Sequence, residues 1–164
     1  MSIAVHTQYA LSGLGIPTAT EIEDWAKAAI GASAHAREQL DAELTVRIVD
    51  EHEGAALNQA YRQRSGATNV LSFPFTPPMN PLFGADVQNY LGDLVICAPV
   101  VAREAYAQGK DLTAHWAHMV VHGSLHLLGY DHNDDDQAKA MEALEINILI
   151  NIGYANPYLE TDDV

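Results

Sequence analysis

The chain has 164 residues, 48% of them hydrophobic, and a formal net charge of −14 at pH 7. This length and composition fit one globular domain with a full-sized core, so we expect residues 1–164 to form a single domain. The acidic balance argues against a protein that grips nucleic acid non-specifically through a basic surface.

The expected elements of the N-terminal half alternate between strands and helices. Thr20 and Glu23 have the spacing of a capping box, which predicts the start of an alanine-rich helix. Leu44, Val46 and Ile48 alternate with polar residues, as in a half-buried strand. In chain order we expect a strand at 3–9, a helix at about 20–36, a strand at 43–49, a helix capped by Asp50 that runs to about 61, and a strand at 69–73.

The C-terminal half opens with prolines and ends in helices. Four of the seven prolines (74, 77, 78 and 81) fall together, which predicts a long loop. We then expect a buried strand at 90–97 and helices at about 99–108, 111–128 and 134–152. The order β-α-β-α-β-β-α-α-α predicts an α/β (or α+β) fold with a small mixed sheet packed with helices.

Neither membrane attachment nor secretion is indicated. The strongest apolar run, 94–102, is far too short to span a bilayer and contains Pro99. The first ten residues have no basic stretch followed by a long apolar core, so we expect no signal peptide. Cys97 is the only cysteine and fits a reducing compartment, and we therefore expect a cytoplasmic protein.

Three histidines near the C-terminal end form the strongest motif. His122 and His126 are four residues apart, so on a helix they lie on one face, one turn apart. Gly129 can end that helix in the left-handed conformation, and the chain can then bring back His132. Three imidazoles on one side of an ion make an open zinc site, with one position left for water or substrate.

The same helix carries two further histidines, His115 and His118. His118 and His126 are separated by about 12 Å of helix rise, too far to share one ion. The pair formed by His118 and His122 has no comparable third ligand downstream, so we favour 122, 126 and 132. We expect His115 and His118 to make ordinary hydrogen bonds, with His118 a candidate to support a metal ligand or contact a substrate.

The spacing H-x-x-x-H-x-x-G-x-x-H is also the frame of the metzincin peptidases. Those enzymes place Glu directly after the first histidine, as the base that activates water. This chain has Gly123 there, at a position that we expect to face the surroundings of the metal. The sequence therefore predicts a metal site without the peptidase base.

Three blocks of the chain resemble the YbeY family of bacterial zinc-dependent endoribonucleases. The first is the histidine run 122–132, the second combines 57–62 with 68–74, and the third is 91–96. They occur in the family's order, and the resemblance covers essentially the whole chain. It implies a single catalytic, metal-binding domain that cuts single-stranded RNA during ribosomal RNA maturation, especially at the small-subunit 3′ end, and acts in ribosome quality control.

The same resemblance implies roles for particular residues. It makes His122, His126 and His132 the ligands of one zinc ion, and Arg62 the functionally important arginine. Many family members carry Asp where this chain has Asn69. The implied partners are single-stranded ribosomal RNA and the ribosome or its small-subunit proteins, with no membrane.

The residues leave several roles open. Arg62 lies in the acid-free stretch 54–85. Its guanidinium could bind phosphate through a bidentate pair of hydrogen bonds, or it could simply be solvated at a helix end. Asp93 and Asp131 are either loop and edge carboxylates or partners that orient a histidine. No general base is evident. Alternative functions are a ribosome-associated assembly module with structural zinc, or a zinc hydrolase of another class.

Overall fold

The computed structural model describes residues 2–38, 40–76 and 89–159. Four strands form one mixed sheet in the order β1-β2-β4-β3. Their bounds are β1 (Ile3–Tyr9), β2 (Ala42–Val49), β3 (Val70–Pro74) and β4 (Tyr90–Cys97). Strands β1, β2 and β4 run parallel to one another, while β3 pairs antiparallel with β4 at the edge of the sheet. The predicted α/β fold with a small mixed sheet is confirmed, and every predicted strand is correct to within one residue at each end.

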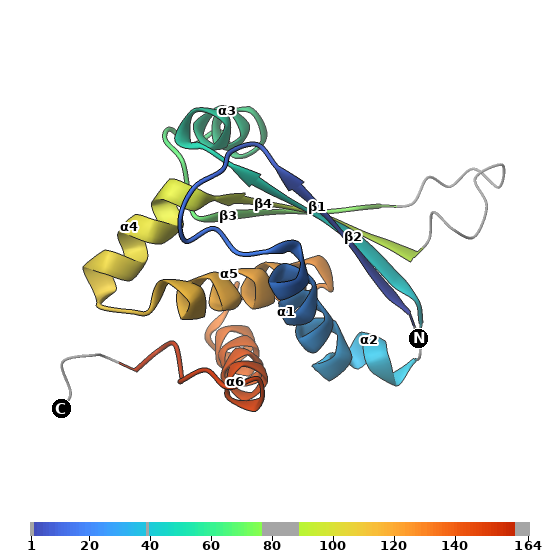
Figure 1. Cartoon of the computed structure of the whole chain (residues 1–164). Coiled ribbons are helices and arrows are strands. Elements are labelled where there is room, and N and C mark those ends of the chain that lie inside the picture. The colour runs from blue at the N-terminus through green and yellow to red at the C-terminus, as the bar shows by residue number, and fades with distance from the viewer. Residues whose placement is uncertain (1, 39, 77–88, 160–164) are drawn as a thin grey trace, which may run out of the picture.

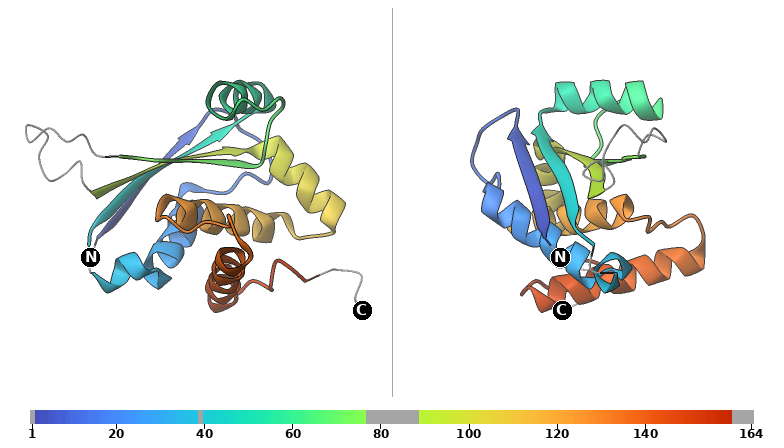
Figure 2. Two further views of the ribbon diagram at one scale, coloured as in Figure 1. Left: turned by 180° about the vertical axis from the view of Figure 1, so that it is seen from behind. Right: turned by 90° about the vertical axis from the view of Figure 1, so that its right-hand side faces the viewer.

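Six helices in the described residues cover both faces of the sheet. They are α1 (Ala19–Ala32), α2 (Ala34–Arg37), α3 (Glu51–Arg62), α4 (Ala98–Gln108), α5 (Leu112–Leu127) and α6 (Asp135–Asn151). Helix α3 lies on one side of the sheet, whereas α1 and α5 pack against the other side and α6 lies beneath α5 (Figures 1 and 2). None of the helices in the described ranges has the length and apolar character needed to cross a bilayer.

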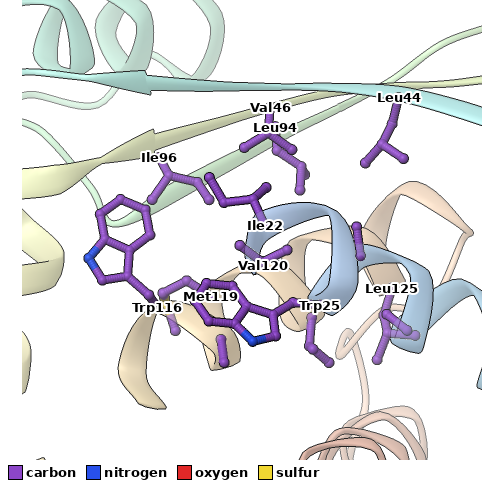
Figure 3. Packing of buried hydrophobic residues seen from close by; sticks show 14 of the residues in the cluster. Ile22, Trp25, Leu44, Val46, Leu94, Ile96, Trp116, Met119, Val120 and Leu125 are labelled. Carbon is purple, nitrogen blue, oxygen red and sulfur yellow. The ribbon is translucent and has the colours of Figure 1, made fainter. Parts of the chain in front are cut away.

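The core lies between the sheet and the layer formed by α1 and α5 (Figure 3). The alternation seen in β2 explains its sheet side, because Leu44, Val46 and Ile48 are all fully buried there. Trp116 and Val120 of α5 close the same core from below. This packing fixes α5 along the sheet, and α5 is the helix that carries the histidine motif.

The start of α1 corrects one prediction. The capping box is Thr18 with Glu21, not Thr20 with Glu23: the Thr18 hydroxyl accepts from the Glu21 N–H at 3.2 Å, and Glu21 accepts from the Thr18 N–H at 3.0 Å. Both pairs have the same spacing, but the earlier start follows directly on Pro17. The helix also ends earlier, at Ala32, and a separate short helix α2 follows.

Other helix ends agree with the sequence. Asp50 caps α3 by accepting from the Glu53 N–H at 2.9 Å, and Asp134 caps α6 by accepting from the Gln137 N–H at 2.8 Å. The predicted proline-rich loop falls largely at 77–88, which lies outside the described residues.

Gly92 is required where β4 meets the edge strand. It sits opposite Pro74, with φ of +139°, and a Cβ at this position would lie 2.2 Å from the Phe73 carbonyl oxygen. We predict that Gly92→Ala lowers the free energy of unfolding by more than about 3 kcal/mol, because unfavourable backbone geometry and a collision with backbone add together. Gly66→Ala is the control, since Gly66 has φ of +83° but open space around it, and should cost only about 1–2 kcal/mol. Urea unfolding of both variants checks this, and equal losses would contradict it.

Candidate metal centre

The end of α5 brings the three predicted ligands together. Helix α5 ends at Leu127, and Gly129 adopts φ of +99°. The Gly129 N–H donates to the His126 carbonyl at 3.0 Å and the Tyr130 N–H to the Leu125 carbonyl at 3.1 Å, a paired arrangement that closes helix ends around a left-handed residue. The chain reverses here as predicted and returns His132 toward His122 and His126.

The three imidazoles are spaced to share one ion. Their ligand nitrogens all lie within 4.8 Å of one another, and the Nε2 atoms of His122 and His126 are 3.1 Å apart. Two nitrogens at zinc-binding distance on a tetrahedral ion would be about 3.3–3.4 Å apart. The donor set therefore fits the metal that the sequence predicts, with imidazole ligands in a nearly suitable geometry.

The cluster opens into a cavity of about 500 Å³. His122 and His126 are half-buried and His132 is exposed, so one side of the cluster is accessible. Asp131 is the only acid among the described residues that line the cavity, so the local charge is far less negative than the chain as a whole. An accessible side is what distinguishes a metal site that can take a substrate from a closed structural one.

Burial, followed by repulsion from His122 and His132, lowers the pKa of His126 below its usual range. The charge of Asp131 and, after it, a hydrogen bond with the backbone of Tyr130 oppose this shift. At neutral pH His126 is thus held in the neutral form, which is the form that binds a metal.

Sequence reasoning missed Glu145, a buried carboxylate of α6 behind the cluster. Its Oε1 lies 2.9 Å from Nδ1 of His122, while its Oε2 lies 2.6 Å from Nε2 of His118 and accepts from the Tyr158 hydroxyl at 2.6 Å. Burial alone would raise the pKa of Glu145, but the hydrogen bonds from His118, His122 and Tyr158 lower it to about 2. Burial and the bond to Glu145 raise the pKa of Tyr158 above its usual value. The carboxylate is therefore ionised and the phenol protonated.

Glu145 also corrects the expectation that His118 and His122 lack a third ligand. His118, His122 and Glu145 have ligand atoms within 4.8 Å of one another and make a second possible cluster that shares His122. It is much less accessible, because His118 and Glu145 are 7% and 1% exposed. Of the two clusters, only the one with His126 and His132 has an exposed member, and only in that cluster do all three residues line the cavity.

Arg62, far from the histidines in sequence, lines the same cavity. It is the last residue of α3, and its Nη2 donates to the Ser72 carbonyl of β3 at 2.8 Å. Its guanidinium also lies 5.0 Å from the centre of the Phe73 ring. The edge strand β3 thus lies between α3 and α5 and brings a permanent positive charge to the candidate metal centre.

Other polar residues named from the sequence have different surroundings. Asn69 lines the cavity, and its amide donates to Glu104 at 3.1 Å; Glu104 also lies 3.0 Å from Nε2 of His115. Asp131 accepts from the backbone N–H of His132 at 2.8 Å, so it shapes the loop that carries this ligand. Asp93 is exposed and accepts from the Tyr90 hydroxyl in a groove that contains none of the histidines, so its suggested role beside a histidine is wrong.

The expectation that position 123 faces the metal is also wrong. A Cβ on Gly123 would lie 2.9 Å from Cδ2 of Leu94 and 3.2 Å from Cγ2 of Val70, so this position faces the sheet. The Ser72 hydroxyl also donates to the Gly123 carbonyl at 3.3 Å. Gly123 lets α5 approach β3 and β4 closely, and a glutamate there would collide with the sheet.

Together, fold and cavity define a class of protein. In this small α/β fold, the end of α5 and the loop after it present three convergent imidazoles, and the end of α3 adds a guanidinium. Metal-dependent hydrolases of phosphate esters combine these two kinds of group, since both stabilise charge on phosphate oxygens.

Comparisons with known proteins identify the family. Residues 13–153 match the family described as Endoribonuclease YbeY. The chain is 51% identical over 158 residues to "Endoribonuclease YbeY" of Nitrosococcus oceani, covering 96% of this chain and 98% of that one. It is 53% identical over 154 residues to the protein of the same name from Xanthomonas axonopodis pv. citri, covering 94% and 92% of the two chains. This chain belongs to the endoribonuclease YbeY family, which confirms the predicted family and the predicted class of enzyme.

A solved structure supports the fold independently. The solution structure of TM1509 from Thermotoga maritima matches with a TM-score of 0.58 and 23% sequence identity, covering 92% of this chain and 88% of that one. At this identity the likeness concerns the fold alone.

Proposed function

We propose that this chain is a zinc-dependent endoribonuclease that cuts single-stranded ribosomal RNA. The observation that carries the proposal is the placement of His122, His126, His132 and Arg62 around one open cavity. In this proposal the histidines hold one zinc ion, Arg62 is the catalytic residue, and the whole chain acts as one catalytic domain. The biological role is maturation of ribosomal RNA, especially at the small-subunit 3′ end, and ribosome quality control in the cytoplasm.

In this proposal the bound zinc and Arg62 both stabilise negative charge on the phosphate. When bound, zinc would supply Lewis-acid stabilisation of the charged phosphate. Arg62 is permanently protonated and directs its planar donors at non-bridging oxygens, where negative charge grows during cleavage. Its bond to the Ser72 carbonyl fixes the guanidinium relative to β3, so little reorganisation is needed when the phosphate enters.

Charge helps to explain the partners. The net charge of −14 is unfavourable for gripping naked RNA over a wide surface, but the cavity itself is lined by cationic and neutral groups with one acid. We propose that small-subunit ribosomal proteins, which are basic where they contact RNA, supply the remaining attraction and present the RNA strand to the cavity.

The test is cleavage of a single-stranded RNA by purified protein in three states: zinc-loaded, chelator-treated and reloaded. We expect endonucleolytic products in the first and third states, little cleavage in the second, and much slower cleavage of the same sequence in a duplex. Retained zinc without cleavage of free RNA or of small-subunit precursors would contradict the nuclease proposal and favour an assembly module. Zinc-dependent cleavage of an unstructured peptide would instead favour a hydrolase of another class.

A further inference from the structure

We propose that Glu145 is the positioning residue of the metal centre: it fixes the orientation and the tautomer of His122, while His118 and Tyr158 hold its carboxylate in place. This inference rests on the proposed function, because it takes His122 as a metal ligand. It concerns a residue outside the three ligands and assigns a role to the C-terminal segment that carries Tyr158.

The location of Glu145 is the first argument. It is 1% exposed, on the face of α6 that also buries Met141, Ile148 and Leu149. An ionised carboxylate among apolar side chains is strongly unfavourable unless hydrogen bonds compensate it. Glu145 is hydrogen-bonded to two histidines of α5 and to Tyr158. A charged residue that contacts the metal centre therefore occupies a buried position where leucine would pack well.

The tautomer of His122 follows from this contact. An ionised carboxylate can only accept, so the 2.9 Å contact with Oε1 of Glu145 places a proton on Nδ1 of His122. In a neutral imidazole the lone pair is then on Nε2. That is the nitrogen 3.1 Å from Nε2 of His126, on the side where the ligands converge. Carboxylates that orient metal-binding histidines in this way are widespread.

The second oxygen of Glu145 explains why the carboxylate stays in place. Oε2 lies 2.6 Å from both Nε2 of His118 and the hydroxyl of Tyr158. His118 comes from the previous turn of α5, whereas Tyr158 comes from the segment that follows α6. Tyr158 is 42% exposed, so its side chain reaches from the buried carboxylate to solvent. The C-terminal segment is thereby joined to the metal centre through one hydroxyl group.

The competing interpretation is a second metal ion held by His118, His122 and Glu145. The distances disfavour it, since 2.6 Å between Oε2 and Nε2 of His118 is a hydrogen-bond length and is shorter than the roughly 3.3 Å between two ligands of a tetrahedral ion. Such an ion would also have to share His122 through Nδ1 while the first ion uses Nε2.

Two measurements on the full chain test the proposal. Nitrogen NMR of the histidine rings in the metal-free protein should show His122 with its proton on Nδ1, and Glu145→Gln should turn this signal into a tautomer mixture. Competition with a chromophoric chelator should show zinc bound about 10–100-fold more weakly by Glu145→Gln. Tyr158→Phe should weaken it less, by up to about 10-fold. Asp136→Asn is the charge control: it removes one negative charge from an exposed position of the same helix that is not among the described residues lining a pocket with His122 or His132, and it should change affinity less than twofold.

The outcomes separate this proposal from the proposed function. Wild-type affinity in Glu145→Gln, an equal loss in Asp136→Asn, or an Nε2-protonated His122 in the wild type would each overturn the positioning role. Two zinc ions per chain, falling to one in Glu145→Gln, would establish the second metal site instead. Absence of zinc binding by the wild type would overturn the proposed metal centre, while the NMR result would still report on the contact between Glu145 and His122. If Glu145→Gln does not fold, Tyr158→Phe and the wild-type spectrum decide.

Discussion

Replacing His122, His126 or His132 with alanine should weaken zinc binding by more than about 100-fold. Removing a group that only orients a ligand typically costs 10–100-fold, and removing a ligand itself should exceed that range. Each histidine supplies one of three nitrogens that lie within 4.8 Å of one another, and no other described histidine lines the cavity. Zinc content after extensive dialysis and competition titration with a chelator measure the effect.

The controls separate the two clusters that share His122. His52→Ala alters an exposed histidine of α3 and should leave zinc binding unchanged. His118→Ala should weaken zinc binding only moderately, because His118 reaches the ligand set through Glu145. Full zinc occupancy in His132→Ala, together with loss in His118→Ala, would show that the ion belongs to the buried cluster of His118, His122 and Glu145.

The fold was largely predictable because its signals are local. The alternation of Leu44, Val46 and Ile48 is a property of one strand, and the apolar stretch of β4 has a strand's length and ends. The start of α1 was misplaced because two overlapping Thr-x-x-Glu pairs carry the same local signal. Spacing alone therefore could not choose between Thr18 and Thr20, and in the structure Thr20 lies inside the first turn of α1.

In the candidate site, too, the residues linked by local spacing could be predicted and those on other elements could not. His122, His126 and Gly129 are linked by helix periodicity, so their convergence with His132 could be predicted from spacing. Glu145 could not be found by spacing, since it lies on another helix. One signal was available: Glu145 falls in the apolar stripe of α6, four residues after Met141 and three before Ile148.

Two predictions were wrong because side-chain directions were assigned without knowing which face of the sheet α5 covers. Gly123 follows a ligand in sequence, yet its Cα faces Leu94 and Val70, because α5 packs on β3 and β4 through that side. Asp93 precedes the buried Leu94 by one residue, and alternation along β4 therefore directs its side chain to the opposite face of the sheet. Both directions follow from which face of the sheet α5 covers.

Arg62→Ala should lower the rate of RNA cleavage by about 10²-fold or more, the scale of one lost donor to developing charge. The guanidinium shares a cavity with the three histidines, but among the described residues its hydrogen bonds go to the carbonyls of Tyr61 and Ser72. Zinc affinity should therefore stay at the wild-type value. The melting temperature should change little, because Arg62 is exposed and its described partners are two backbone carbonyls and one ring.

Two substitutions make this prediction specific. Arg62→Lys should recover little activity, because an ammonium group keeps the charge but lacks the planar pair of donors that fits a phosphate. Arg64→Ala is the matched control, since Arg64 is exposed two residues further along and is not among the described residues that line the cavity. Single-turnover cleavage of one RNA by all four proteins, at equal zinc content, gives the comparison. Normal cleavage by Arg62→Ala, or equal losses in Arg62→Ala and Arg64→Ala, would mean that Arg62 contributes general attraction for RNA and not stabilisation of the transition state.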